Sequence, residues 1–113
     1  MNKYMNRKTV VDGQKFDSKK EANRWTELKL MERAGLITDL KRQVRFLLTP
    51  TVYDEQGKCK MPSSSYIADF VYRKNHKLVV EDVKGYKKGP AYGLFVQKKK
   101  VMYDKYKIFV EEI

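Results

Sequence analysis

The sequence predicts a small α/β domain in which helices flank a mixed central sheet. Three observations lead to this class. The chain has 113 residues, the usual size of one domain, and 42% of them are hydrophobic, enough for a modest core. The segments follow the order helix, three strands, helix, strand. No repeat or linker divides the chain, so we expect one domain over 1–113 with a mobile basic tail at 1–8.

The first part of the chain predicts a hairpin followed by a capped helix. An Asp-Gly pair between apolar residues is typical of a hairpin turn and predicts a hairpin over 9–16. Ser18 with Glu21 three residues later forms a capping box, which marks a helix start. Gly35 suits the position just after a helix end. We therefore expect a helix over about 19–34.

The remaining segments predict the sheet and a second helix. Runs of β-branched and aromatic residues alternate with polar stretches, and Pro50 indicates an edge or a bulge. Pro90 suits the first position of a helix. The expected elements are a strand over 43–53, a polar loop over 54–65, strands over 66–73 and 78–85, a helix from Pro90, and a strand over 107–113.

The charge of the chain favours a polyanionic partner. Lys and Arg total 25 against 14 acids, for a net charge of +11. Such a balance is most typical of nucleic-acid binding, although it also suits a merely soluble basic surface. A single Cys59 and a single His76 exclude an internal disulfide and a zinc site, and they fit a reducing compartment. No apolar run approaches the roughly 20 residues of a membrane helix, and we expect a cytoplasmic protein without a signal peptide.

A carboxylate interrupts one of the expected central strands. Side chains alternate along a strand, so Ile67, Asp69 and Val71 are expected to share a face. Burial of an unpaired charge between two β-branched residues would cost several kcal/mol. Another group must therefore compensate Asp69.

The next strand carries an acid and a base where burial should continue. Leu78, Val80, Asp82 and Lys84 are expected to share a face that begins apolar. The short turn between the two strands makes them antiparallel neighbours. Asp69 and Asp82 are then expected to lie close together on one face, with Lys84 beyond them.

Two neighbouring carboxylates repel each other, and a proton or a cation must offset that repulsion. Oxygen ligands suit Mg²⁺ or Mn²⁺, and a lysine beside such a metal could orient a water or stabilise a phosphorane-like transition state. This is the arrangement that phosphodiester hydrolysis needs. A plain Asp–Lys salt bridge at a strand end explains the same residues without a reaction. The acid-x-Lys pattern occurs four times in the chain, but only Asp82-x-Lys84 follows a strand with an embedded acid.

Glu21 is a third candidate with two open interpretations. The capping box explains a glutamate at this position. At 100° per residue, however, Glu21 also lies on the helix stripe of Trp25 and Leu28, which should face the sheet. A glutamate at the start of that stripe could reach the carboxylates of the sheet.

These residues and their order resemble the PD-(D/E)XK nuclease superfamily, with its restriction-endonuclease-like αβββαβ core. The segments FDSKKE (16–21), YIADF (66–70) and VEDVKG (80–85) are most similar to phage endonuclease I-type Holliday-junction resolvases, and to small phage and prophage proteins of this length. The resemblance spans roughly residues 14–113, with specific motifs at about twenty positions. Ala68 stands where the family pattern expects proline.

The resemblance implies a site and an activity. Glu21, Asp69 and Asp82 would bind Mg²⁺ or Mn²⁺ together with the backbone carbonyl of Val83, and Lys84 would be the catalytic lysine. The implied protein is a phage-encoded, metal-dependent DNA endonuclease that hydrolyses branched DNA during recombination in a bacterial host. Symmetric cleavage of a junction implies a homodimer.

Basic side chains around these motifs are the expected DNA contacts. They are Lys19, Lys20, Lys87, Lys88, Lys98, Lys99 and Lys100. The alternative for the helix lysines is a solvated face. For the whole chain, the alternatives are a non-catalytic basic nucleic-acid-binding module, in which the acids and Lys84 form a structural ion-pair cluster, and a nicking, homing-type or RNA-cutting nuclease.

Overall fold

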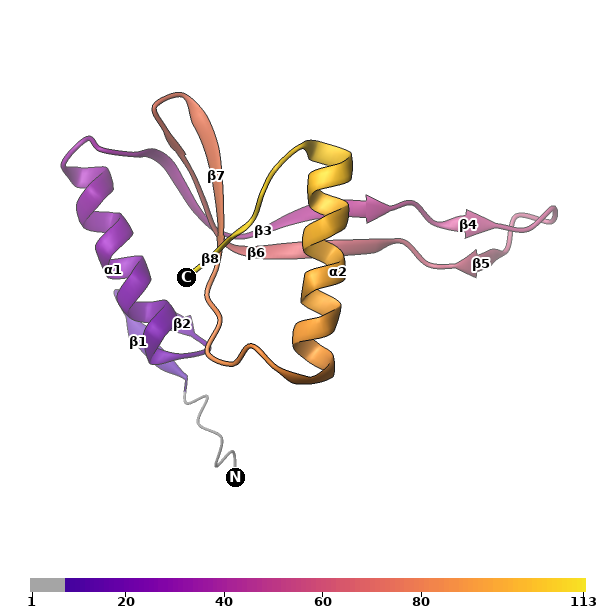
Figure 1. Ribbon diagram of the computed structural model, residues 1–113, viewed down its shortest axis with the longest axis horizontal. Coiled ribbons are helices and arrows are strands. Elements are labelled where there is room, and N and C mark those ends of the chain that lie inside the picture. The colour runs from indigo at the N-terminus through magenta and orange to yellow at the C-terminus, as the bar shows by residue number, and fades with distance from the viewer. Residues whose placement is uncertain (1–7) are drawn as a thin grey trace.

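A four-stranded mixed sheet forms the centre of the computed structural model, which describes residues 8–113 (Figure 1). The strand order is β3-β6-β7-β8. Strand β6 is antiparallel to both of its neighbours, β3 and β7, whereas β8 is parallel to β7. These strands are β3 (Thr38–Thr49), β6 (Ser64–Lys74), β7 (Lys77–Asp82) and β8 (Glu111–Glu112). The predicted mixed α/β class is confirmed.

Two helices flank this sheet. Helices α1 (Lys19–Arg33) and α2 (Gly89–Tyr106) lie on opposite sides of the strands (Figure 1). Ser18 caps α1 by accepting a hydrogen bond from the backbone N–H of Glu21 over 3.0 Å. Gly35 follows the helix end with a φ of +79°, a left-handed conformation that glycine adopts without steric cost. The predicted boundaries of the first helix are confirmed to within one residue.

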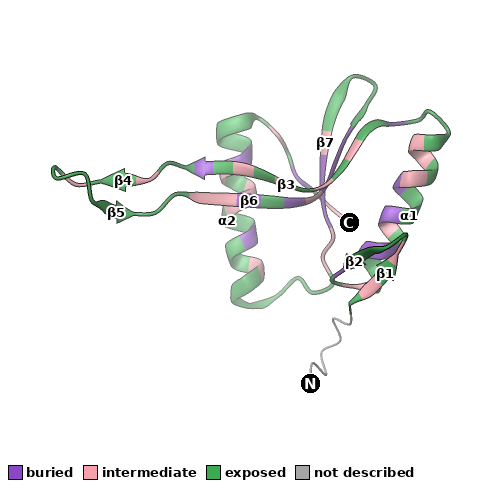
Figure 2. Ribbon diagram, turned by 180° about the vertical axis from the view of Figure 1, so that it is seen from behind, coloured by how far each residue is buried: buried purple, intermediate pink, exposed green. Residues whose placement is uncertain are grey.

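The core is divided into two clusters of buried side chains, one under each helix (Figure 2). The α1 cluster consists of Phe16, Ala22, Trp25, Leu28, Ile37, Phe70 and Tyr72. The α2 cluster consists of Leu48, Tyr66, Ala68, Val71, Val80, Phe95, Met102 and Val110. The sheet contributes to both, so it is buried on both sides where the helices cover it.

Strand β6 changes the side on which its even-numbered residues pack. Tyr66 and Ala68 belong to the α2 cluster, whereas Phe70 and Tyr72 belong to the α1 cluster. The change falls at Asp69. Long two-stranded ribbons twist strongly, and such a twist lets one strand serve both helices.

The expected facing is therefore wrong for β6, whereas on β7 Val80 and Asp82 both lie on the α2 side, as expected. At the point where alternation fails on β6, Gln43 of β3 lies opposite Asp69, between two regular pairs, and has a left-handed φ of +53°. On β6, Ile67 is exposed while Val71 is buried. On β7, Leu78 is likewise exposed, so it does not begin a buried face.

The predicted polar loop over 54–65 is also wrong in part. Strands β4 (Val52–Tyr53) and β5 (Cys59–Met61) pair and continue the β3–β6 ribbon into a long arm (Figure 1). Pro50 separates β3 from β4, as expected of a residue that lacks a backbone N–H.

The ends of the predicted strands also differ. The strand expected over 78–85 ends at Asp82, and the strand expected over 107–113 is limited to β8. The hairpin expected over 9–16 is confirmed as β1 (Thr9–Val11) paired with β2 (Gln14–Phe16). Of the basic tail expected at 1–8, residues 1–7 lie outside the described part; Lys8 is exposed and pairs with Asp17.

None of the helices within residues 8–113 combines the length and the apolar character needed to cross a membrane.

Candidate active site

Three acidic side chains approach one another from three different elements. Glu21 lies in the first turn of α1, and Asp82 is the last residue of β7; each is only 5% exposed. Asp69 is half-buried in β6 at the point where that strand changes sides. Its position lets it lie between Glu21, on the α1 side, and Asp82, on the α2 side.

The environment of Asp69 is short of positive charge. Burial, followed by the neighbouring charge of Asp82, raises the pKa of Asp69 to about 7, and Glu21 acts in the same direction. The backbone N–H of Val83 donates to Asp69 Oδ2 over 2.8 Å and partly offsets this rise. The amide of Gln43 lies 3.5 Å from Asp69 Oδ1. The three acids Glu21, Asp69 and Asp82 together therefore favour the binding of a proton or a cation near neutral pH.

Lys84 lies beside Asp82 and is held there from several directions. Its Nζ is 3.0 Å from Asp82 Oδ1 and 3.9 Å from the centroid of the Phe95 ring. Its backbone N–H donates to the carbonyl of Ile113 over 3.2 Å. The hydroxyl of Tyr66 donates to Asp82 Oδ2 over 2.5 Å, and burial together with this bond raises the pKa of Tyr66. Both oxygens of Asp82 thus have partners that fix its orientation.

Glu21 is turned toward the sheet rather than toward its own helix terminus. Arg42 Nη2 lies 3.5 Å from Glu21 Oε1. This oxygen is buried and has no hydrogen-bond donor among the described residues. Ser18 caps the helix, as predicted, but only the backbone N–H of Glu21 takes part. The Glu21 carboxylate accepts no bond from Ser18 and has Arg42 as its ion-pair partner, so the side chain follows the second interpretation rather than a full capping box.

The donor set fits a hard divalent cation in its chemistry. Carboxylate oxygens are the ligands that Mg²⁺ and Mn²⁺ prefer, and the raised pKa of Asp69 marks unmet demand for positive charge. Oε1 of Glu21, although near Arg42, has no hydrogen-bond partner among the described residues and is free to bind a ligand. As placed in residues 8–113, however, no three His, Cys, Asp or Glu side chains form a group that could hold a metal ion. Ligation by all three acids therefore requires side-chain movement. The expected fourth ligand, Val83, follows Asp82 directly and would contribute its carbonyl oxygen.

A cleft of about 440 Å³ opens beside Asp82 and Lys84. Its remaining lining comes from β6 and from the first three turns of α2, and is formed by Ser65, Tyr66, Ile67, Ala91, Leu94, Phe95 and Lys98. Lys98 is thus the predicted DNA contact that lies in the cleft with the candidate catalytic residues.

The other lysines predicted to contact DNA differ in their exposure and in whether they pair with an acid. Lys19, Lys20, Lys87, Lys88 and Lys100 are exposed, and Lys99 is half-buried. Lys20 Nζ donates to the carbonyl of Lys84 over 2.8 Å, which connects the start of α1 to the site. Lys99 pairs with Glu112 at 2.8 Å, and Lys87 lies 3.7 Å from the same carboxylate. Two of the seven are therefore partly neutralised within the chain.

A buried ion pair next to the site had no signal in the sequence. Glu81 is 1% exposed and receives two hydrogen bonds from Arg24, at 2.8 and 2.6 Å, and one from the hydroxyl of Tyr72. The pair with Glu81 raises the pKa of Arg24. As expected, Glu81 faces away from Asp82; its role is to connect α1 to β7. The contacts of Tyr66 and Arg42 with the acids were also missed, because they depend on tertiary packing.

The fold and the site define a mixed α/β protein with three acids and a lysine near the point where the end of β7 lies against the middle of β6. The chain belongs to the family described as "Protein of unknown function (DUF1064)", whose model matches residues 1–111. No curated protein and no solved structure matches the chain.

Proposed function

We propose that the protein is a metal-dependent DNA endonuclease. The observation that carries this proposal is that the charges of Asp82 and Glu21 both act on Asp69, whose own charge is not fully compensated, with Lys84 beside Asp82. A merely structural cluster would be expected to balance its charges. An excess of buried negative charge beside a held lysine instead suits a site completed by a cation and by a phosphate.

The residues divide the work of hydrolysis. A bound Mg²⁺ or Mn²⁺ would lower the pKa of a water and neutralise charge on the leaving oxygen. Glu21, Asp69, Asp82 and the Val83 carbonyl would hold it. Lys84 is placed to orient the attacking water or to stabilise the charge of the transition state, and Tyr66 keeps Asp82 in the orientation that holds Lys84.

Exposed lysines near the starts of the two helices would supply attraction for the DNA backbone. They are Lys19 and Lys20 on α1 and Lys87 and Lys88 before α2, and Lys20 donates to the carbonyl of Lys84. Contacts of this kind give affinity without reading sequence. The resemblance to junction resolvases supports branched DNA as the substrate, a homodimer as the active form, and a phage protein acting in the bacterial cytoplasm.

One observation favours a second candidate function. Lys84 and Tyr66 already satisfy both oxygens of Asp82, as they would in a non-catalytic DNA-binding module with a structural ion pair. A nicking or homing-type nuclease of the same fold is a third possibility, which differs in substrate and not in site.

Cleavage assays with matched variants separate these functions. Supercoiled plasmid, a four-way junction and linear duplex are incubated with the protein in Mg²⁺, Mn²⁺, Ca²⁺ or EDTA. We expect cutting in Mg²⁺ or Mn²⁺ and none in EDTA, with the junction preferred. Retarded migration without cutting in any metal would instead support the binding module.

The Asp82→Asn variant should lose cleavage by about 100-fold or more while DNA binding survives, because the loss of an acid does not weaken attraction to phosphate. Asp104→Asn, at an exposed position on α2, makes the same charge change and serves as the control. Wild-type cleavage by Asp82→Asn would show that the site is misassigned.

A further inference from the structure

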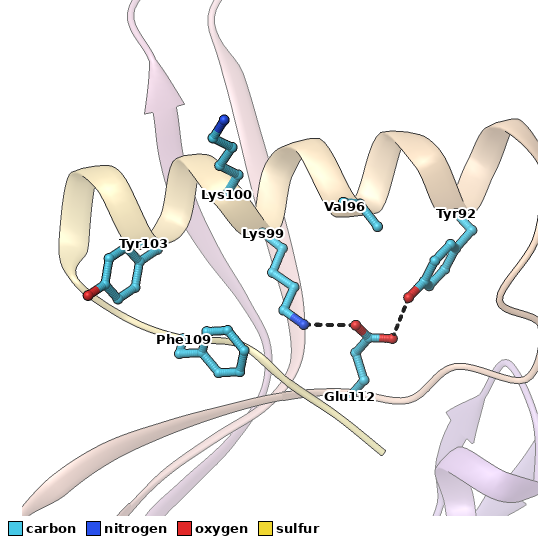
Figure 3. A pocket seen from close by; sticks show the side chains of 7 residues that line it. All are labelled: Tyr92, Val96, Lys99, Lys100, Tyr103, Phe109 and Glu112. Carbon is cyan, nitrogen blue, oxygen red and sulfur yellow. Dashed lines mark hydrogen bonds and ion pairs between the residues drawn. The ribbon is translucent and has the colours of Figure 1, made fainter.

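A second hollow lies on α2, on a different face of the helix from the cleft of the candidate active site. This groove, of about 670 Å³, lies between α2 and the C-terminal segment (Figure 3). It is lined by Tyr92, Val96, Lys99, Lys100, Tyr103 and Phe109, with Glu112 at its base. The helix residues recur every three to four positions and so form one stripe along α2.

The groove presents large aromatic surfaces to solvent. Tyr103 is 52% and Phe109 61% exposed, although both are ring side chains that usually pack in a core or at an interface. Figure 3 shows the two rings at the same end of the groove, with Tyr92 at the other end. Exposed rings from two segments at one end of a groove indicate a surface that binds a flat or apolar partner.

Cations accompany these rings. Lys99 Nζ lies 4.6 Å from the Phe109 ring centroid, and Lys107 Nζ lies 5.6 Å from that of Tyr103. The acid of the groove, Glu112, is offset by Lys99, by the hydroxyl of Tyr92 at 2.9 Å and by Lys87. Together with Lys100 on the rim, the groove therefore has a net positive charge.

The groove is adjacent to the proposed active site. Helix α2 forms a wall of both hollows: Leu94 and Lys98 face the cleft, whereas Val96 and Lys99 face the groove. Strand β8 connects them as well, because Glu112 pairs with Asp82 in the sheet.

We propose that this groove binds unpaired nucleotides of a DNA substrate. Proteins that bind single strands combine a positively charged groove with aromatic side chains on which bases stack, and this groove has both. The inference rests on the proposed endonuclease function and narrows its substrate to DNA with single-stranded nucleotides close to the cleavage point. Phe109 and Tyr103 would stack on bases, and Lys100 and Lys107 would contact phosphates.

Charge favours DNA over a second copy of this chain as the occupant. In a two-fold symmetric dimer the patch faces a second copy of itself, so two grooves that each have a net positive charge, from Lys99 and Lys100 against Glu112, would be brought together. Like charges brought together at an interface are unfavourable. A polyanion meets the same lysines favourably.

The test measures binding without cleavage. Fluorescence anisotropy in EDTA gives the affinity for a labelled oligothymidylate of about 15 nucleotides and for a duplex of equal length. Phe109→Ala should weaken oligothymidylate binding about tenfold, because stacking contributes ~1–3 kcal/mol per base, and should leave duplex binding unchanged. Phe109→Trp keeps a ring and should retain the affinity. Tyr53→Ala removes an equally exposed ring from the β4–β5 arm and serves as the control.

The outcomes separate this inference from the endonuclease proposal. If Phe109→Ala binds oligothymidylate as the wild type does, the groove proposal is overturned, whether or not the protein cuts DNA. Conversion of a dimer into a monomer by Phe109→Ala, with unchanged affinity for oligothymidylate, overturns it in favour of a second copy. If the wild type cuts nothing in any metal but Phe109→Ala selectively loses oligothymidylate binding, the groove stands and the endonuclease proposal fails.

Discussion

Asp69 lies between the two sides of the sheet, each of which is covered by one helix. It lies where β6 passes from the α2 cluster to the α1 cluster, and its charge interacts with Asp82 on one side and Glu21 on the other. A carboxylate in such a place destabilises the fold when ionised, because burial and two like charges oppose its ionisation. A site that binds a cation can tolerate that cost, since the cation removes it.

This cost predicts the pH dependence of the metal-free protein. The pKa of Asp69 rises from an ordinary 3.8 to about 7 in the folded state. Its contribution to stability is therefore fully present below about pH 4 and is lost as the pH rises through about 7. In EDTA at about pH 7.5, Asp69→Asn should be more stable than the wild type by on the order of 3 kcal/mol, and the difference should disappear toward pH 4.

Urea unfolding at several pH values measures this effect, and Asp39→Asn, at an exposed position of β3, is the matched control. Mg²⁺ should raise the Tm of the wild type more than that of Asp69→Asn, because ligand binding stabilises only the state that binds it. Equal stability of the two proteins at neutral pH would contradict the assignment of an uncompensated charge to Asp69.

Single residues of the site were predictable to different degrees. Ser18, Glu21 and the stripe with Trp25 were readable, because capping and helical periodicity are local. The faces of Ile67 and Val71 were not, because strict alternation assumes a regular strand and β6 changes sides at Asp69. The exposure of Leu78 was not readable either, because it depends on tertiary packing.

At the scale of elements, the buried pair of Arg24 and Glu81 sets how α1 lies against β7. Arg24 is one helical turn after Glu21, and Glu81 directly precedes Asp82. The two hydrogen bonds between them, supported by Tyr72, therefore fix the spacing of two candidate metal ligands that do not touch the pair.

Breaking this pair should be costly. Arg24→Ala leaves Glu81 buried without its cation and should lower the free energy of unfolding by about 3–5 kcal/mol. Arg24→Met combined with Glu81→Leu should recover most of that loss, because no buried charge remains unpaired. Urea titrations of the single and double variants provide the measurement.

Arg33→Ala, at the exposed end of α1, controls for the loss of an arginine from this helix. If the effects of Arg24→Met and Glu81→Leu simply add, the two side chains are not coupled and the pair does not fix α1 to β7.

The order of elements was predictable because hydrophobic periodicity and turn residues are local signals. The β4–β5 arm was missed because Gly57 and the charged residues around it are typical of a loop, and they do form the turn at its tip. The last strand was predicted to be longer than it is, because an apolar run does not show how many of its residues pair with a neighbouring strand. Strand β8 pairs with only Glu81 and Asp82 of β7.

At the scale of the whole molecule, the lysines behind the net charge of +11 are not equally placed to bind DNA. Several lysines pair with acids, as Lys99 does with Glu112, whereas Lys19 and Lys88 are exposed at the starts of the two helices. Lys74 and Lys77 lie at the opposite end of β7, at the β6–β7 turn. Lys19 with Lys88 and Lys74 with Lys77 contribute the same charge, so only their positions distinguish the two sets.

The salt dependence of DNA binding tests that distinction. Each lysine that neutralises a phosphate steepens the fall of log K with log salt by about 0.9 in duplex DNA. Lys19→Ala combined with Lys88→Ala should therefore reduce the slope by up to roughly 2, and should weaken binding similarly for all sequences. Lys74→Ala combined with Lys77→Ala makes the same change in net charge and should leave the slope close to that of the wild type. Anisotropy titrations in EDTA between about 50 and 200 mM salt measure both slopes. Equal reductions in the two double variants would mean that DNA binds the charge of the whole molecule rather than the surface around Asp82 and Lys84.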